Sequence, residues 1–125
     1  MIETSDLLRM RWRLGARGPH EIDCLGVSMV LLARMGRAIE DPWQRLLRRW
    51  QAGEDPAHVL DESPGDGWFR VLPDERSLQG DLWILGTDPL GAGVVFEGRL
   101  WTATREANVV ARPLSWRRAI GVWRK

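Results

Sequence analysis

Three side chains in this 125-residue sequence could take part in nucleophilic catalysis: one cysteine and two histidines. Cys24 follows Asp23 and begins an apolar run, so we expect it at a helix N-terminus, where the backbone dipole favours the thiolate and lowers the pKa of the thiol. A nucleophilic thiolate also needs a base within hydrogen-bond reach. His20 or His58 could supply that base only if the fold brings an imidazole to the sulfur. Cys24 is therefore either a nucleophile or a small residue that packs in the core.

Other kinds of site find little support in the sequence. His20 and Cys24 are two metal ligands with no second pair nearby, so we expect no metal site. The glycines at 91–98 do not follow the dinucleotide-binding pattern, and there is no phosphate-binding loop, so we expect no cofactor. Asp81 and Asp88 could form a carboxylate pair, although turn or capping roles are more common for aspartates near strand ends.

The helix expected to position Cys24 spans residues 24–36. Its apolar residues recur with a period of 3.6, which indicates one buried face. Asp23 is a favourable N-cap, and Gly36 is a favourable end because glycine tolerates the left-handed conformation found after many helices. Two further helices are expected, over residues 4–14 and over residues 41–52.

The helix expected over 41–52 has the clearest boundaries of the three. Asp41 can cap its N-terminus, Pro42 suits the first helical position, and Gly53 ends it. Residues 53–66 are acidic and rich in turn formers, which predicts a surface loop with one helical turn at 56–61.

The second half of the chain reads as short strands between turn signals. Residues 97–98 and 105–108 are expected to form hairpin turns. Helices followed by strands are typical of an α+β domain, and the length suits a single domain over residues 1–125. The expected strands cover residues 67–72, 81–86, 92–98, 99–105, 108–114 and 120–124.

The order of these motifs resembles the NlpC/P60 family of cysteine peptidases, in particular the short members encoded with phage tail genes. "GARGPHEIDCLGVSMVLLARMG" (15–36) resembles the loop, acid, cysteine and apolar helix of that family. "LQGDLWIL" (78–85) resembles its Gly-Asp and first central strand, and "GAGVVFEGRLWTATREANVVARPLSW" (91–116) resembles the strand and hairpin that follow. The resemblance covers about residues 12–125, including the final "IGVWRK". It implies a papain-like fold in which N-terminal helices pack on a C-terminal antiparallel β-meander of five or six strands.

The sequence departs from this family at the position of the catalytic base. The family histidine corresponds to Gly91, and its polar third residue falls near Thr102. Glycine cannot take up a proton, and general acid–base catalysis contributes about 10²–10⁴ to such rates. The resemblance therefore implies that no catalytic residues remain, with Cys24 as a vestigial nucleophile unless His20 or His58 replaces the base.

The resemblance implies a structural role in a phage tail tip or baseplate. The chain would be made in the host cytoplasm, reside in the virion tail and contact hub and tail-tip proteins. Two alternatives remain open at this point. One is an active tail endopeptidase that cuts peptidoglycan with Cys24 as nucleophile. The other is a non-catalytic module that binds a peptide or glycan, so contact with peptidoglycan is compatible with the sequence.

Composition favours protein partners over nucleic acid or membrane. The net charge is +1, which gives no overall basic field, and no apolar run approaches the length of about 20 residues that spans a bilayer. The chain has eight tryptophans and only one lysine among its 18 basic residues, and Trp and Arg are enriched at interface hot spots. The residues we expect to contact neighbouring subunits are Trp43, Arg45, Arg48, Arg49 and Trp50.

Overall fold

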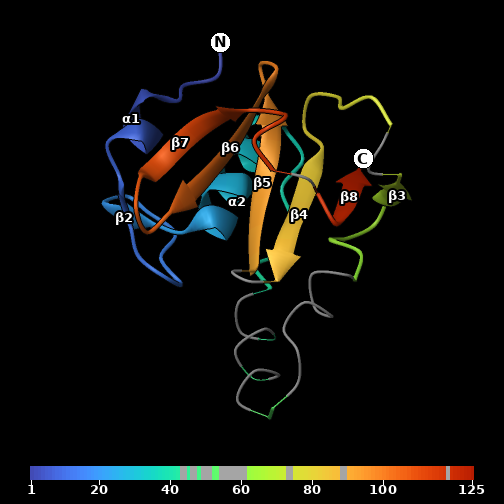
Figure 1. Ribbon diagram of the computed structural model, residues 1–125, viewed down its shortest axis with the longest axis horizontal. Helices are drawn as coiled ribbons and strands as arrows, with labels where there is room; N and C mark the ends of the chain where they lie inside the picture. The colour runs from blue at the N-terminus through green and yellow to red at the C-terminus, as the bar shows by residue number, and fades with distance from the viewer. Residues whose placement is uncertain are drawn as a thin grey trace.

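A computed structural model describes a small α+β protein (Figure 1). The described residues are 1–42, 45, 48, 52–53, 62–72, 75–87, 90–117 and 119–125. The elements with described bounds are α1 (Ser5–Leu8), β1 (Arg11–Trp12), β2 (Glu21–Ile22), α2 (Cys24–Arg34), β3 (Phe69–Val71), β4 (Leu82–Thr87), β5 (Leu90–Phe96), β6 (Arg99–Thr104), β7 (Asn108–Pro113) and β8 (Gly121–Arg124).

Strands β3 to β8 form one antiparallel sheet in the order β3–β8–β4–β5–β6–β7. Each of the six expected strands is present, so the α+β class is confirmed. Strands β4 to β7 are consecutive neighbours, as in a meander. The expectation of a simple meander is wrong for β8, which lies between β3 and β4 and pairs Trp123 with Leu82 and Val122 with Val71.

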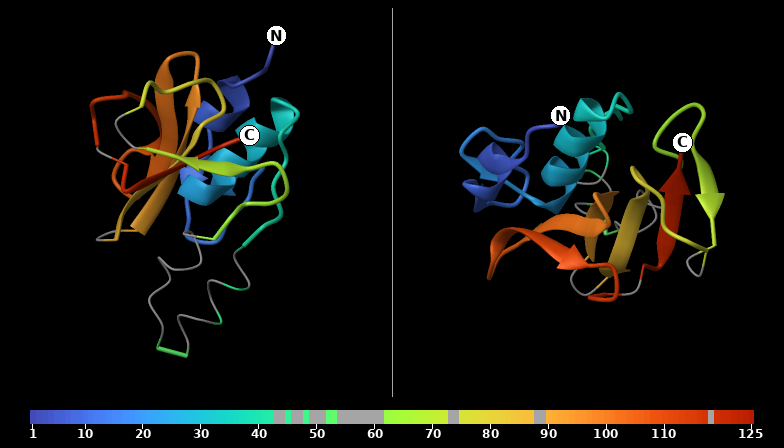
Figure 2. Two further views of the ribbon diagram at one scale, coloured as in Figure 1. Left: turned by 90° about the vertical axis from the view of Figure 1, so that its right-hand side faces the viewer. Right: turned by 90° about the horizontal axis from the view of Figure 1, so that it is seen from above.

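The N-terminal elements cover one face of this sheet (Figure 2). Helix α2 packs on β5 and β6, and α1 contacts β7. Alternate strand residues face opposite sides: Val94 and Trp101 belong to the core shared with α2, whereas Val95 and Leu100 belong to a second apolar cluster. Trp116 packs against that second cluster, so the sheet has apolar cover on both sides.

Helix α2 begins and ends at the residues that the sequence marks. The Asp23 carboxylate accepts a hydrogen bond of 2.8 Å from the Gly26 amide, which confirms the N-cap. At the other end Gly36 has a φ of 76°, and the amides of residues 36 and 37 donate to carbonyls of the last turn. This is a Schellman arrangement, in which a left-handed residue satisfies the terminal carbonyls. The helix ends at Arg34, two residues before the expected boundary.

The helix expected over residues 4–14 is much shorter than predicted. Helix α1 stops at Leu8, and Trp12 lies in β1, which pairs in parallel with β2. The Trp12 amide donates to the Asn108 side chain at the start of β7, with a distance of 2.9 Å. The amides of residues 11–13 therefore donate hydrogen bonds to other segments and not to a longer helix. Helix propensity and apolar spacing alone could not predict these contacts.

The segment over residues 41–52 is described only in part. Arg45 and Arg48 are helical and exposed, and Arg45 pairs with Glu62 at 3.1 Å. The Asp41 carboxylate, expected as a cap, binds the Arg17 guanidinium. Of the expected site and contact residues and ranges, Trp43, Arg49, Trp50, His58, Asp88 and residues 56–61 lie outside the described part of the chain.

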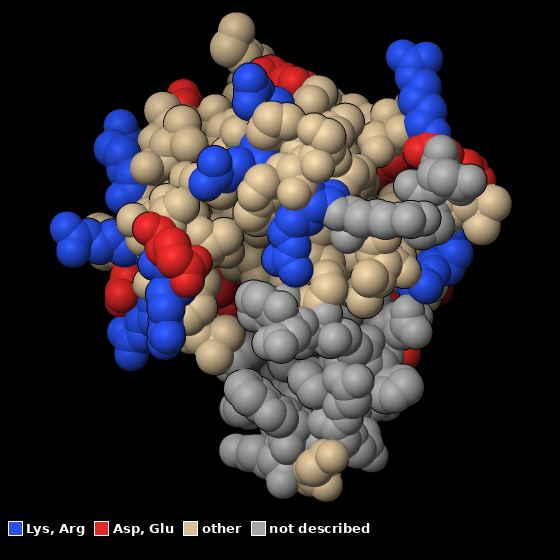
Figure 3. Space-filling model, viewed as in Figure 1, with Lys and Arg blue, Asp and Glu red and all other residues tan. Residues whose placement is uncertain are grey.

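Charged side chains of both signs are distributed over the surface. On the face seen in Figure 3, basic side chains lie both in the middle of the surface and at its margins, and acidic ones lie nearer to the margins. Among the described residues, no helix has the length and apolar character needed to cross a membrane.

Candidate functional site

Cys24 occupies the first position of α2, directly after the capping residue Asp23. The residue is partly exposed and forms no disulfide. Asp23 is held by three donors, since the amides of Gly15 and Gly26 and the Arg17 guanidinium all reach its carboxylate at 2.7–2.8 Å. The Asp23 carboxylate thus holds both the loop before α2 and the first turn of the helix.

Gly91 in β5 faces the Cys24 sulfur. A Cβ atom placed on Gly91 would lie 4.0 Å from Cys24 Sγ and 3.6 Å from Leu85 Cδ1, both ordinary van der Waals distances. A Cβ at this position would therefore contact the sulfur without a clash. Position 91 thus lies close enough to the thiol for a base, but Gly91 has no side chain.

Thr102 in β6 lies in the same region and is fully buried. Its hydroxyl donates a hydrogen bond of 2.7 Å to the carbonyl of Ala92, the residue after Gly91. The Thr102 hydroxyl proton thus takes part in a hydrogen bond to the backbone of β5. Thr102 supports the strand that carries Gly91, and this role requires no titratable group.

One cleft of about 460 Å³ brings these three positions together. Cys24, Gly91 and Thr102 all line it, although they come from α2, β5 and β6. Trp12 and Trp116 also line the cleft. The structure therefore joins the three residues that the sequence had singled out from distant parts of the chain.

The electrostatic environment keeps the Cys24 thiol neutral. Burial is the main cause that raises the pKa of the thiol to about 11, and the neighbouring Asp23 carboxylate contributes to the rise, against smaller opposing effects of the Ala92 and Leu25 backbone and of Arg17. The backbone at the start of the helix lowers this pKa, as expected, but burial and Asp23 outweigh it. The carboxylate that caps the helix is itself an unfavourable neighbour for a thiolate.

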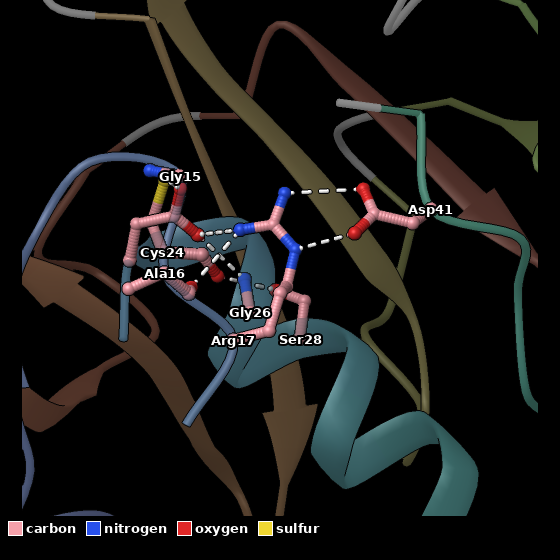
Figure 4. A network of polar contacts seen from close by, with 8 residues as sticks. Gly15, Ala16, Arg17, Cys24, Gly26, Ser28 and Asp41 are labelled. Carbon is pink, nitrogen blue, oxygen red and sulfur yellow. Dashed lines mark hydrogen bonds and ion pairs between the residues drawn. The ribbon is translucent and has the colours of Figure 1, made fainter. Parts of the chain in front are cut away.

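A second feature beside the cysteine is a bridge made by Arg17 (Figure 4). The Arg17 guanidinium donates to Asp23 at 2.7 Å and to both oxygens of Asp41 at 2.8 and 3.1 Å. Its partly buried position makes these charge-assisted bonds stronger than surface pairs. The bridge ties the start of α2 to the start of the segment that follows Asp41, and it was not anticipated from the sequence.

His20 does not line the cleft that contains the Cys24 sulfur. His20 is exposed and lines a separate surface hollow formed by residues 13–21. Among the described residues that line the cleft there is no histidine, and His58 lies outside the described residues. The described part of the chain also holds no group of three or more His, Cys, Asp or Glu side chains arranged for a metal ion.

Asp81, for which a turn or capping role was expected over a carboxylate pair, is bound by an arginine and by a nearby backbone amide. Both of its oxygens accept hydrogen bonds of 2.8 Å from Arg124, and the Leu78 amide donates to it at 2.9 Å. Asp81 is fully buried, so this pair joins the start of β4 to the end of β8. The aspartate therefore has a structural role.

Sequence reasoning missed the contacts between arginine and tryptophan at the rim of the cleft. Arg105 lies over the Trp12 ring at 5.4 Å from its centroid, and Arg117 lies over the Trp116 ring at 5.8 Å. The high content of both residue types was a signal for such contacts, but the pairs join residues far apart in the sequence or in an irregular loop. The contact residues expected from the sequence lie elsewhere, within residues 43–50.

No protein-family model matches the sequence, and no curated protein matches it with significant similarity.

Proposed function

We propose that this protein is a non-catalytic, NlpC/P60-like module with a papain-like arrangement, which serves as a structural component of a phage tail tip or baseplate. Its work is contact with hub and tail-tip proteins. The non-catalytic part of the proposal rests on the residue that lies against the Cys24 sulfur. That residue is Gly91, which has no side chain to accept a proton. The phage setting follows from the resemblance of motifs and their order.

The placement of three residues supports the NlpC/P60-like part of the proposal. That family requires a cysteine at a helix start, a base on a central strand and a polar residue on the next strand. Cys24 begins α2, Gly91 lies on β5, Thr102 lies on β6, and all three line one cleft.

The chemistry of the cleft supports a role without catalysis. With a thiol pKa of about 11, only about one molecule in 10⁴ carries a thiolate at pH 7. No described side chain of the cleft is a histidine that could accept the thiol proton or return it to a leaving amine. Acyl transfer from an amide needs both steps, so the endopeptidase alternative lacks the groups it requires in the described residues.

Two measurements on the purified protein test this proposal. The rate of Cys24 alkylation by iodoacetamide should rise with pH only in the range of a buried thiol, well above the ordinary thiol pKa of about 8.5. Incubation with peptidoglycan fragments should release no new peptide ends. Hydrolysis that disappears in Cys24→Ser, together with alkylation that titrates below pH 8, would overturn the proposal in favour of the endopeptidase.

The tail location needs a separate test. Mass spectrometry of purified tail particles should detect the chain at a fixed ratio to the other tail proteins, because a structural component has a defined copy number. Absence of the chain from intact particles would contradict the tail assignment, even if the protein has no activity.

A further inference from the structure

Two arginine–tryptophan stacks stand at the rim of the cleft that contains Cys24. Arg105 covers the Trp12 ring, and Arg117 covers the Trp116 ring. All four side chains line the cleft. Stacking on an indole orients the plane of a guanidinium while leaving its N–H groups at the edge available for hydrogen bonds.

These two arginines have no acidic partner among the described residues. In the described part of the chain neither Arg105 nor Arg117 has a carboxylate within ion-pair distance. Five other arginines pair with carboxylates, namely Arg13, Arg17, Arg34, Arg45 and Arg124. The cleft thus holds two oriented cations whose charge no described group of the protein neutralises.

The cleft lining carries two carboxylates besides the two stacked arginines. Asp23 accepts hydrogen bonds from the Gly15 and Gly26 amides and shares the Arg17 guanidinium with Asp41. Glu106 is exposed, and among the described residues it forms no ion pair with Arg105 or Arg117. The N–H groups of both stacked guanidinium groups are therefore available to the carboxylates of a ligand.

The cleft also has the size and the apolar surface for a side chain. Its volume of about 460 Å³ lies within the range of about 300–1,000 Å³ that is usual for small-ligand sites. Leu85 and the two indole rings supply apolar lining, and Gly91 leaves the space beside the Cys24 sulfur open. A ligand that combines carboxylates with an apolar side chain matches both features.

We propose that this cleft binds an extended acidic segment of a partner protein, whose carboxylates pair with Arg105 and Arg117 while an apolar side chain enters beside Gly91. The inference rests on the proposed function, because it names the chemistry of one contact that a structural tail component would make. It moves the expected contact surface from residues 43–50 to the former catalytic cleft.

Fluorescence anisotropy with three labelled octapeptides tests this inference on the full chain. The peptides carry two glutamates, two glutamines or two lysines on either side of one leucine. The glutamate peptide should bind saturably and more weakly as salt rises, because the contact is between exposed charges. The glutamine and lysine peptides should bind at least about tenfold more weakly, since charge-assisted bonds to arginine are lost.

Two variants and a matched control locate the binding site. Arg105→Gln and Arg117→Gln should each weaken binding of the glutamate peptide by about tenfold. Arg9→Gln removes the same charge from an exposed residue outside the cleft and should leave binding unchanged. The glutamate peptide should also slow alkylation of Cys24 at high pH, which places it in the cleft. Circular dichroism confirms that each variant is folded.

Three results would overturn the inference. One is equal binding of all three peptides, another is binding that Arg105→Gln and Arg117→Gln do not change, and the third is tighter binding of a single-stranded oligonucleotide, which arginine and tryptophan stacks can also favour. None of these results alters the thiol reactivity or the lack of hydrolysis. Failure here is therefore distinguishable from failure of the proposed function.

Discussion

At the scale of single residues, the pair formed by Cys24 and Gly91 decides the chemistry of the cleft. The order of motifs in the sequence identifies Gly91 as the residue in the place of a base, and the structure places it against the sulfur. The raised pKa of the thiol could not be predicted in the same way. It depends on burial and on the distance to a carboxylate, and both arise only after α2 packs on the sheet.

The substitution Gly91→His should restore reactivity to the thiol. A Cβ at this position meets only ordinary contacts, and an imidazole beside the sulfur would act as a proton acceptor and as a cationic partner for the thiolate. We expect alkylation by iodoacetamide at pH 7 to become at least about tenfold faster. Gly91→Gln is the matched control, because it adds similar bulk without a titratable group. Equal rates in the two variants would show that position 91 does not reach the sulfur.

The substitution Asp23→Asn should change both the pKa of Cys24 and the stability. Removal of the carboxylate lowers the pKa of the thiol, although burial still holds it above the ordinary value. The loss leaves the partly buried Arg17 with Asp41 alone, and we expect a destabilisation of about 1–3 kcal/mol. Urea unfolding and a pH titration of alkylation measure the two effects.

Glu21→Gln is the control for that experiment. Glu21 pairs with Arg13 on the surface, where both side chains are well exposed, so its loss should cost less than about 1 kcal/mol. A cost at Asp23 no larger than the cost at Glu21 would show that the bridge through Arg17 contributes nothing to the fold.

At the scale of elements, predictions succeeded where local residues set the boundary. Asp23 and Gly36 bracket α2, and the hairpin turn at 97–98 has the positive φ values, 50° at Glu97 and 74° at Gly98, that suit its Gly-containing sequence. Predictions failed where distant contacts decide. The short α1 and the insertion of β8 beside β4 both depend on pairing between segments far apart in the chain.

The pair formed by Asp81 and Arg124 should be the most costly ion pair to break among those described. Asp81 is fully buried and binds Arg124 through both oxygens. Arg124→Met leaves a buried carboxylate without its partner, for which we expect a loss of about 3–5 kcal/mol in urea unfolding. The double variant Asp81→Leu with Arg124→Met should recover part of this loss, since no charge is left unpaired. A loss below 1 kcal/mol in Arg124→Met would contradict the structural role.

The ion pair between Asp6 of α1 and Arg34 of α2 makes a pH-dependent contribution to the stability of the fold. Hydrogen bonds from Arg34 hold the pKa of Asp6 at about 2, below its usual value. A depressed acid pKa stabilises the fold above the unfolded pKa of about 4, and this contribution is lost as pH falls toward 2. Asp6→Asn should therefore cost about 1 kcal/mol or less at pH 7, because the pair is about one-third exposed.

Urea unfolding at several pH values checks this expectation. The two curves of stability against pH, for the unsubstituted protein and for Asp6→Asn, should approach one another between pH 4 and pH 2. A difference that stays constant down to pH 2 would show that the effect of the substitution does not come from the ionised carboxylate.

At the scale of the whole molecule, the α+β class and the six-stranded sheet could be predicted from the alternation of strands and turns, whereas the cleft could not. Its wall is built from β1, α2, β4, β5, β6 and the loop around Trp116. No local pattern encodes which arginine will lie over which tryptophan. The sequence therefore singled out Cys24, Gly91 and Thr102, which line the cleft, but not the arginine–tryptophan contacts beside them.

If the proposed role as a structural tail component holds, the tail should not need the thiol of Cys24. In a phage whose copy of the gene is replaced, Cys24→Ser should leave particle yield, tail composition and infectivity unchanged, because the side chain keeps nearly its size and no reaction depends on it. Deletion of the gene should instead reduce the yield of complete tails. Quantitative mass spectrometry of particles and plaque counts measure both effects. Particles of normal composition that fail to infect only when Cys24 is replaced would show that the thiol does chemistry during entry, since a purely structural subunit has no other use for the sulfur.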